Sequence, residues 1–385
     1  MKNKLYEYVK YFSEGIGPRL TASDGERRAG NHIVSQLESL GYTPLIEKFK
    51  TPKSPYEIYQ FVYLTGFLIC ISFLKFNFYL KLFLILSEIF LILFFYFEFI
   101  FIHTPLFKFF KRYDSKNIFV KIPAKESVKT RIIVTAHIDS ATASILFLPK
   151  FVKYLAKQIQ LSFLNFILLL LVSIISLYYS NIILNILLSI IGAINFIGFI
   201  ITFHSEYIAK PTNGANDNAS SIAILLGLAE HFSKKRFNNK EIWLVFTGAE
   251  EAGCIGIYEF LKKHKKKIDK DTYFIVLDCT GIGIPVFIRS EGMLKKYKSD
   301  QHLLNILEQS AKELDIKYQI QDLPVGYTEM EVIKNFGYKT IAIGAASENP
   351  NDIPKWHQID DVIRYIQPYT LLNIFRLVSY TIEML

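Results

Sequence analysis

Two long apolar stretches dominate the hydropathy pattern of the chain. The first runs from about residue 58 to residue 102 and is interrupted near its middle by Lys75 and Lys81. The second runs from about residue 161 to residue 203, with the polar sequence Tyr-Tyr-Ser-Asn at 178–181 near its middle. Each half has about the twenty residues that a helix needs to cross a bilayer. The pattern therefore predicts two transmembrane α-helical hairpins, four spans in all.

Two carboxylates interrupt the first apolar stretch. Glu98 lies close to the end of its predicted span, where we expect its side chain to reach the membrane interface. Glu88 lies deeper, and an ionisable group at that depth is costly to bury unless it is paired. We expect Glu88 to have a structural role in pairing helices.

The rest of the sequence has the mixed composition of a soluble α/β domain. Short β-rich runs alternate with helical segments, and the runs are apolar on both faces. The predicted strands are Thr43–Phe49, Arg131–Ala136, Glu241–Thr247, Tyr273–Asp278 and Thr340–Gly344, and the predicted helices include Arg27–Leu40, Ser220–Phe232 and Leu303–Leu314. This alternation predicts a doubly wound, largely parallel sheet. Ligands bind such sheets beyond the carboxyl ends of the strands.

The hairpins divide the soluble sequence into three pieces. We expect residues 1–56, 106–158 and 205–385 to form one catalytic domain, with the transmembrane hairpins 57–105 and 159–204 inserted into its loops. Insertions at surface loops are tolerated when both ends of the insert leave from one surface.

The distribution of basic residues bears on the orientation of the chain in the membrane. The net charge is +9, but no nucleic-acid-binding motif is present, so the expected partners are a peptide substrate and the lipid bilayer. The flanks of the hairpins on the soluble side carry Lys50, Lys53, Lys108, Lys111, Arg112, Lys116, Lys150, Lys153, Lys157 and Lys210. The opposite side has only Lys75 and Lys81. The positive-inside rule therefore predicts a multi-pass protein whose catalytic domain faces the cytoplasm, and the sequence says nothing about oligomeric state.

Candidate metal-binding and acid–base residues stand where the predicted strands end. They are His137 and Asp139, Asp217 at the start of a helix, the adjacent Glu250 and Glu251, Asp278, and His357 in a loop beyond the last strand. Zinc accepts imidazole nitrogen and carboxylate oxygen, and hydrolytic zinc sites leave a position for water. A pair of zinc ions with one bridging carboxylate needs about five protein ligands, and a further carboxylate must carry the proton. The set matches this requirement.

The motifs around these residues resemble a known family. The segments AHIDS (136–140), NGANDNASSIAILLGLAE (213–230), FTGAEEAGCIG (246–256), VLDCTGIG (276–283) and WHQIDD (356–361) are similar to the di-zinc aminopeptidases of metallopeptidase clan MH. That family includes bacterial leucyl aminopeptidases, glutamate carboxypeptidase and the transferrin receptor. The early segment IGPRLTASDGE (16–26) is similar as well, so the resemblance covers about residues 1–50 and 114–385 and excludes both hairpins.

The resemblance implies a cofactor of two Zn²⁺ and a ligand set for them. One ion would be held by His137 and Asp278, the other by Glu251 and His357, and both by Asp217. The peptide between Asp217 and Asn218 is expected to be cis, a form that is rare outside proline.

The resemblance also implies a reaction. Glu250 would be the general base, and Asp139 would orient His137. The expected activity is hydrolysis of N-terminal residues from peptides by a metal-bridged hydroxide, in a membrane-anchored metallo-aminopeptidase.

Two positions depart from the family's pattern. Trp356 stands before the last histidine, where active aminopeptidases often place a tyrosine whose hydroxyl helps to stabilise the oxyanion; an indole offers only an N–H. The family's usual Ser-Asp pair before the penultimate strand is here Thr328-Glu329. These changes alter the substrate side of the site, and leave the metal ligands unchanged.

Two other functions remain open from the sequence. A zinc acyltransferase of the glutaminyl-cyclase type resembles this fold but uses one zinc. A non-catalytic binding or scaffold relative is the other alternative, although this chain retains the full ligand set and the base. A membrane-embedded metalloprotease is set aside because no HExxH motif occurs in the sequence.

Overall fold

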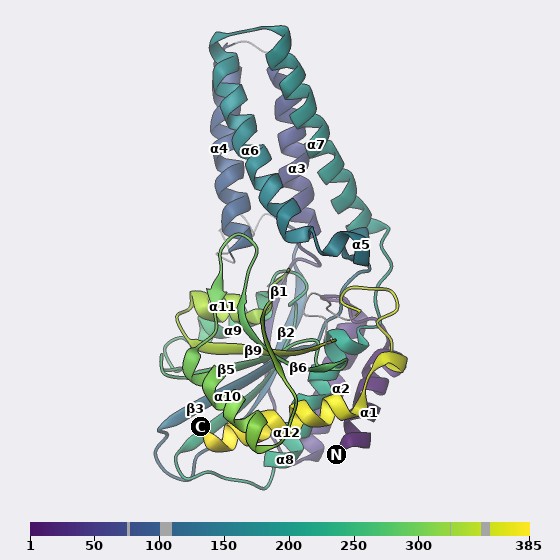
Figure 1. The fold of residues 1–385 in the computed structure, drawn as a ribbon, viewed down its shortest axis with the longest axis vertical. Coiled ribbons are helices and arrows are strands. Elements are labelled where there is room, and N and C mark those ends of the chain that lie inside the picture. The colour runs from purple at the N-terminus through teal and green to yellow at the C-terminus, as the bar shows by residue number, and fades with distance from the viewer. Residues whose placement is uncertain (75–77, 101–109, 324, 348–354) are drawn as a thin grey trace.

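The computed structural model describes residues 1–74, 78–100, 110–323, 325–347 and 355–385. An α/β domain carries a bundle of four long helices at one end, and both chain termini lie at the other end (Figure 1). Lys75 and Lys108, two of the basic residues in the orientation argument, lie outside the described residues.

A nine-stranded sheet forms the centre of the α/β domain. Its strands are β1 (Leu45–Thr51), β2 (Tyr113–Ile122), β3 (Thr130–His137), β4 (Lys240–Thr247), β5 (Tyr273–Leu277), β6 (Ile284–Glu291), β7 (Tyr297–Lys298), β8 (Gln319–Asp322) and β9 (Lys339–Ala346). The order is β1-β2-β4-β3-β5-β9-β6-β7, with β8 paired to β6. The central β4-β3-β5-β9 block is parallel, whereas β1, β2 and β6 join it by antiparallel pairing.

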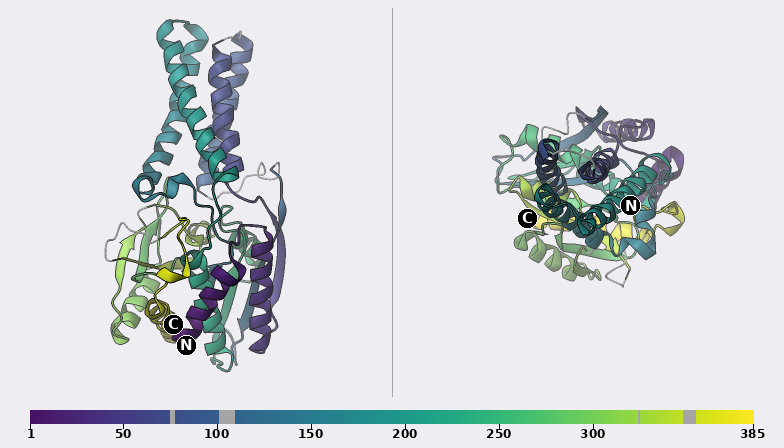
Figure 2. Two further views of the ribbon diagram at one scale, coloured as in Figure 1. Left: turned by 90° about the vertical axis from the view of Figure 1, so that its right-hand side faces the viewer. Right: turned by 90° about the horizontal axis from the view of Figure 1, so that it is seen from above.

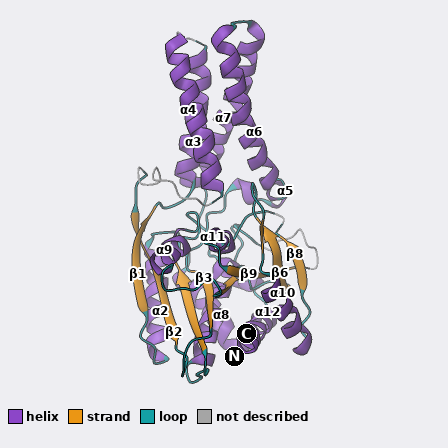
Figure 3. Ribbon diagram, turned by 90° about the vertical axis from the view of Figure 1, so that its left-hand side faces the viewer, coloured by secondary structure: helices purple, strands orange, loops and turns teal. Residues whose placement is uncertain are grey.

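Helices cover both faces of the sheet (Figure 3). One face packs against α1 (Lys2–Lys10), α2 (Asp24–Ser39), α8 (Ser220–Phe232), α10 (Gln301–Glu313) and α12 (Pro368–Met384). The other packs against α9 (Ile255–His264) and α11 (Glu329–Asn335). In β4, Leu244 lies in the first core and Trp243 in the second, as the period of two in a strand requires. The predicted doubly wound fold is confirmed.

The predicted elements of the parallel core appear with small shifts at their ends. The helix predicted at Arg27–Leu40 begins instead at Asp24, because the Ser23 side chain caps it by accepting a hydrogen bond from the backbone N–H of Glu26. The helix at Ser220–Phe232 has the predicted bounds.

The bundle consists of α3 (Tyr56–Phe73), α4 (Phe78–Phe99), α6 (Leu155–Tyr178) and α7 (Ile182–Tyr207), with the short α5 (Pro149–Val152) leading into α6. Each of the four is long and apolar enough to cross a membrane. Helix α3 approaches α7 closely: a Cβ on Gly192 would lie 3.1 Å from the Cβ of Cys70. Helices α3, α6 and α7 extend a few residues beyond the predicted apolar stretches, whereas α4 ends at Phe99, before the predicted end at about residue 102. The five-part division of the chain stays a proposal.

The two carboxylates of the first hairpin behave differently from each other. Glu88 accepts a hydrogen bond of 2.7 Å from the hydroxyl of Ser173 on α6, which links α4 to α6 as the helix-pairing prediction requires. The prediction for Glu98 was wrong. Its side chain is buried instead of reaching an interface, because α4 ends at Phe99 in a core cluster that includes Met293 and Val325 of the α/β domain.

Candidate metal centre

The five predicted ligands lie together at the carboxyl ends of the parallel strands. His137 is the last residue of β3, Glu251 and Asp278 follow β4 and β5, Asp217 precedes α8, and His357 lies in the loop after β9. Three overlapping groups of potential ligand atoms, each within 4.8 Å of one another, are His137–Glu250–Glu251, His137–Asp217–Asp278 and Asp217–Glu251–His357.

Asp217 occupies the middle of this cluster. Its Oδ1 lies 3.3 Å from Nε2 of His137, and its Oδ2 lies 3.3 Å from Nε2 of His357. Nε2 of His357 is also 3.2 Å from Oε2 of Glu251, and Nε2 of His137 is 3.9 Å from Oδ1 of Asp278. The two carboxylate oxygens of Asp217 therefore face two separate donor groups, as a bridging ligand requires. The Asp217–Asn218 peptide is cis.

Asp139 joins the strand-end loops around His137. Its backbone carbonyl lies 3.1 Å from Nδ1 of His137, while its carboxylate Oδ1 is 3.6 Å from that nitrogen. The carboxylate accepts hydrogen bonds from the backbone N–H groups of Glu250 and Glu251, at 3.1 and 3.0 Å, and from the Thr21 hydroxyl at 2.6 Å. Asp139 thus orients His137 through its carbonyl and fixes the two glutamates through its carboxylate.

Glu250 is buried beside the cluster and accepts a hydrogen bond from the thiol of Cys254 at 3.1 Å. Burial, reinforced by the Glu251 carboxylate, raises the pKa of Glu250 well above its ordinary value. A cation bound beside it opposes that shift by favouring the carboxylate. The thiol of Cys254, four residues after Glu250, is thus a hydrogen-bond donor to the candidate base.

The structure reveals two further residues, to which the sequence analysis assigns no role, that hydrogen-bond the backbone segments carrying the ligands. Asp361, the last residue of the WHQIDD motif, accepts hydrogen bonds from the backbone N–H groups of Asn216 and Asp217. Arg19, in the IGPRLTASDGE motif, is fully buried and donates to the carbonyl oxygens of Phe12, Gly17, Ile138, Asn213 and Gly214. Their presence inside family-like motifs was the available signal, but no single sequence feature shows such backbone contacts.

The residues present fit a divalent metal. The donors are imidazole nitrogens and carboxylate oxygens, the set that zinc accepts. Within the described residues, the buried atoms Oε1 of Glu251 and Nδ1 of His357 have no hydrogen-bond partner. Burial alone would lower the pKa of His357, but the Glu251 and Asp217 carboxylates raise it to about 10. Such concentrated negative charge is compatible with bound cations.

The two family departures have structural explanations. The Trp356 ring packs edge-on against Phe147, with centroids 4.9 Å apart, and lies against Gly326, where a Cβ would come within 2.8 Å of the indole. Thr328 caps α11 and donates to the buried carboxylate of Glu291. Trp356 therefore lines the cavity at the cluster, Thr328 braces α11 behind it, and neither replaces a predicted ligand.

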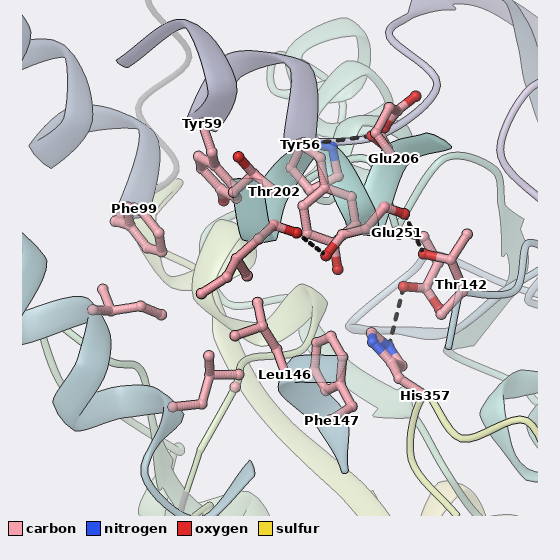
Figure 4. Close-up of a pocket in the computed structure, with 18 of the residues that line it drawn as sticks. Tyr56, Tyr59, Phe99, Thr142, Leu146, Phe147, Thr202, Glu206, Glu251 and His357 are labelled. Atoms are coloured by element: carbon pink, nitrogen blue, oxygen red, sulfur yellow. Dashed lines mark hydrogen bonds and ion pairs between the residues drawn. The ribbon is translucent and has the colours of Figure 1, made fainter. Parts of the chain in front are cut away.

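A cavity of about 970 Å³ opens directly onto the cluster. Tyr56 and Tyr59 of α3, Phe99 of α4 and Phe147 line it together with Glu251 and His357 (Figure 4). The bundle helices thus contribute walls to the site.

Comparisons with known proteins agree with this geometry. Residues 198–382 match the family model described as peptidase family M28. Comparison with curated proteins gave no match. Similar solved structures include a Zn-dependent exopeptidase from Parabacteroides distasonis ATCC 8503, with 15% identity, a TM-score of 0.58, and coverage of 99% of this chain and 97% of that chain.

Two further structures show the same fold with different activities in their names. The zinc aminopeptidase BSAP from Bacillus subtilis is 13% identical, with a TM-score of 0.58, and the match covers 100% of this chain and 95% of that one. A glutaminyl cyclase from Tannerella forsythia is 15% identical, with a TM-score of 0.59 and coverage of 99% and 98%. The resemblance that the sequence motifs indicate is confirmed.

Proposed function

We propose that this chain, which has the zinc-peptidase fold of family M28, is a membrane-anchored aminopeptidase that uses two zinc ions. The observation that carries the proposal is the position of Asp217, whose two carboxylate oxygens face His137 and His357 separately. One carboxylate between two donor groups favours a pair of ions over a single one.

Each ion would have its own terminal ligands. His137 and Asp278 would hold one, Glu251 and His357 the other, and Asp217 both. When bound, such ions act as Lewis acids toward the scissile carbonyl and lower the pKa of water.

The side chains of the protein then transfer the proton and hold the catalytic groups in position. Glu250 takes a proton from the attacking water and returns it to the leaving amine. Asp139 fixes the backbone of Glu250 and of its neighbour Glu251, so that these adjacent side chains can serve different roles. Burial of Glu250 beside Cys254 limits competing contacts with bulk water.

The alternatives are less well supported. A glutaminyl-cyclase-like acyltransferase with one zinc would use only one of the two ligand groups around Asp217, and leaves the other unexplained. A scaffold role leaves the buried base Glu250 unexplained. Solved glutaminyl cyclases share the fold, but fold likeness at this identity does not carry their activity to this chain.

The bundle supports the membrane part of the proposal. Its four helices have the length and apolarity of spans, and their outward side chains are largely apolar. The lysine-rich flanks of the hairpins support a catalytic domain on the cytoplasmic side.

The test is hydrolysis of a panel of aminoacyl-p-nitroanilides by detergent-purified, zinc-loaded protein, with Glu250→Gln as the matched variant. We expect activity in the wild type and at least a 100-fold loss in the variant, with the metal content unchanged, because general-base catalysis contributes about 10²–10⁴-fold. A wild type that binds two ions but cleaves no aminoacyl substrate contradicts the proposal. One tightly bound zinc with cyclisation of N-terminal glutamine supports the acyltransferase instead.

A further inference from the structure

The cavity above the metal centre continues into the helix bundle. At one end it is lined by His137, Asp217 and Glu250. At the other end its walls come from all four long helices and include Tyr63 of α3 and Phe95 of α4. Its volume of about 970 Å³ is at the upper end of the roughly 300–1,000 Å³ usual for small-molecule pockets. The site therefore has room for much more than one amino-acid side chain.

Two apolar stripes mark where the cavity reaches the outside of the bundle. They are Leu161, Leu164 and Leu168 on α6, and Ile194, Ile197 and Ile201 on α7. Both have the spacing i, i+3, i+7, which places each stripe on one helix face. Leu164 and Ile197 are each 57% exposed while also lining the cavity. Residues that do both lie at an opening.

The opening is lateral. Helices α6 and α7 meet at their shared turn and diverge toward the α/β domain (Figure 2, left). Since both helices have the character of membrane spans, the opening between them faces the hydrocarbon of a bilayer. The same cavity is also lined by the exposed side chains of Lys53 and Tyr207 near the soluble domain, which gives it a second, water-facing side.

The proposed function determines what the bundle end of the cavity holds. An aminopeptidase removes one residue, so only one residue lies on the amino side of the scissile bond. The long extension of the cavity must then take the other side, the departing remainder of the chain. Its walls there are mainly leucine, isoleucine and phenylalanine, which favour an apolar chain.

Polar groups inside the apolar part indicate a peptide instead of a fatty chain. Gln158, Ser162 and Asn165 of α6 line the cavity among the apolar residues. Within the described residues, Nδ2 of Asn165 has no hydrogen-bond partner. Backbone amides in a hydrocarbon environment need such partners, whereas an acyl chain does not.

We propose that the substrate is a peptide with a free N-terminus followed by apolar residues, which reaches the metal centre from the bilayer between α6 and α7. This inference rests on the proposed aminopeptidase function. Hydrolysis adds the hydroxyl of water to the carbonyl carbon of the first residue and a proton to the departing amine. The shortened apolar peptide then leaves by the lateral opening, and the free amino acid leaves by the water-facing side.

The test narrows the lateral opening with the double variant Leu164→Trp/Ile197→Trp. The matched control is Leu171→Trp/Ile190→Trp, on the same helices. Those side chains are 53% and 52% exposed and are not among the residues that line the cavity. All proteins are reconstituted in lipid nanodiscs. Three substrates share the N-terminal residue that the wild type hydrolyses best: a p-nitroanilide, a peptide of about ten apolar residues, and an aminoacyl dodecylamide.

We expect the opening variant to lose at least 10-fold in kcat/KM for the apolar peptide and to stay within twofold of wild type for the p-nitroanilide. The control variant should match the wild type on both. Equal loss on both substrates, or no loss on the peptide, overturns the lateral path. A wild type that prefers the dodecylamide to the peptide overturns the peptide assignment. A wild type that cleaves none of the three overturns the aminopeptidase function itself, whereas cleavage of the p-nitroanilide alone overturns only this inference.

Discussion

The carboxylate of Asp361 accepts hydrogen bonds from the backbone that carries Asp217. Its Oδ1 accepts a hydrogen bond of 2.7 Å from the N–H of Asn216, and its Oδ2 accepts one of 3.0 Å from the N–H of Asp217. The Asp361 side chain is buried, and burial raises its pKa to about 7 despite these two donors. A residue from the WHQIDD motif thus fixes the proposed bridging ligand, 144 positions earlier in the chain.

Asp361→Asn should weaken metal binding without removing a ligand. An amide has one acceptor oxygen, so one of the two backbone N–H groups would face the NH₂ group. Groups that orient ligands typically contribute 10–100-fold in metal affinity. We expect a zinc dissociation constant raised by about 10-fold or more, measured by competition with a chromophoric chelator. Asp360→Asn is the control, because Asp360 pairs with Lys355 in a partly exposed position and, among the described residues, makes no side-chain contact with the ligands. Equal affinities in the two variants would contradict the assignment.

Asp217→Asn and Asp278→Asn should differ in metal stoichiometry. If Asp217 belongs to both ions, its loss weakens both, whereas loss of Asp278 weakens only the ion held with His137. After dialysis against limiting zinc, elemental analysis should find close to no zinc in the first variant and about one ion per chain in the second. Loss of a single ion in both variants would show that Asp217 does not bridge.

The order of elements and the cluster could be predicted because their signals are local. Each strand that carries a predicted ligand is a short apolar run, and a parallel sheet brings the carboxyl ends of such runs to one edge. His137 and Asp278 could therefore be expected to meet although 141 positions separate them. The strand bounds moved by only a few residues, since the ladder of neighbouring strands sets where pairing ends.

Other features depend on packing that no local pattern encodes. β2 alternates lysine, asparagine and apolar residues and was not predicted; it forms because β1 and β4 pair with its two edges. The sequence around Arg19 has no helical or strand periodicity. Its guanidinium donates hydrogen bonds to backbone carbonyl groups of segments that are distant in the sequence. The burial of Glu98 follows from how the bundle sits on the α/β domain, which hydropathy does not show.

Arg19→Met should destabilise the soluble domain. The guanidinium donates to carbonyl oxygens of Ile138, Asn213 and Gly214 among others, and methionine leaves them without a donor. Each buried polar group left without a partner costs about 1–3 kcal/mol, so a total loss of about 3 kcal/mol or more is expected. Thermal unfolding in detergent, followed by circular dichroism, measures it. Arg27→Met on the exposed side of α2 is the control and should change stability by less than about 0.5 kcal/mol. Similar midpoints for both variants would contradict the structural role of Arg19.

Glu291 should make the domain less stable as the pH rises. Its carboxylate is buried on β6 and accepts hydrogen bonds from the backbone N–H and the hydroxyl of Thr328. Burial raises its pKa to about 7 from an ordinary value of 4.5. Burial and the neighbouring Glu291 carboxylate likewise raise the pKa of Glu331 well above its ordinary value. A carboxyl whose pKa is higher in the folded state binds more protons there than in the unfolded state. Its contribution is therefore present below about pH 4.5 and is lost as the pH rises toward 7.

Glu291→Gln should flatten this dependence, because an amide keeps an acceptor for Thr328 and does not ionise. We expect the wild type to lose up to about 3 kcal/mol of unfolding free energy between pH 5 and pH 8, at about 1.4 kcal/mol per pKa unit, and the variant to lose clearly less. Denaturant unfolding of the zinc-loaded protein at several pH values measures the slopes. Glu308→Gln, on the partly exposed side of α10, is the control and should keep the slope of the wild type. A variant slope as steep as that of the wild type would exclude Glu291 as the titrating group.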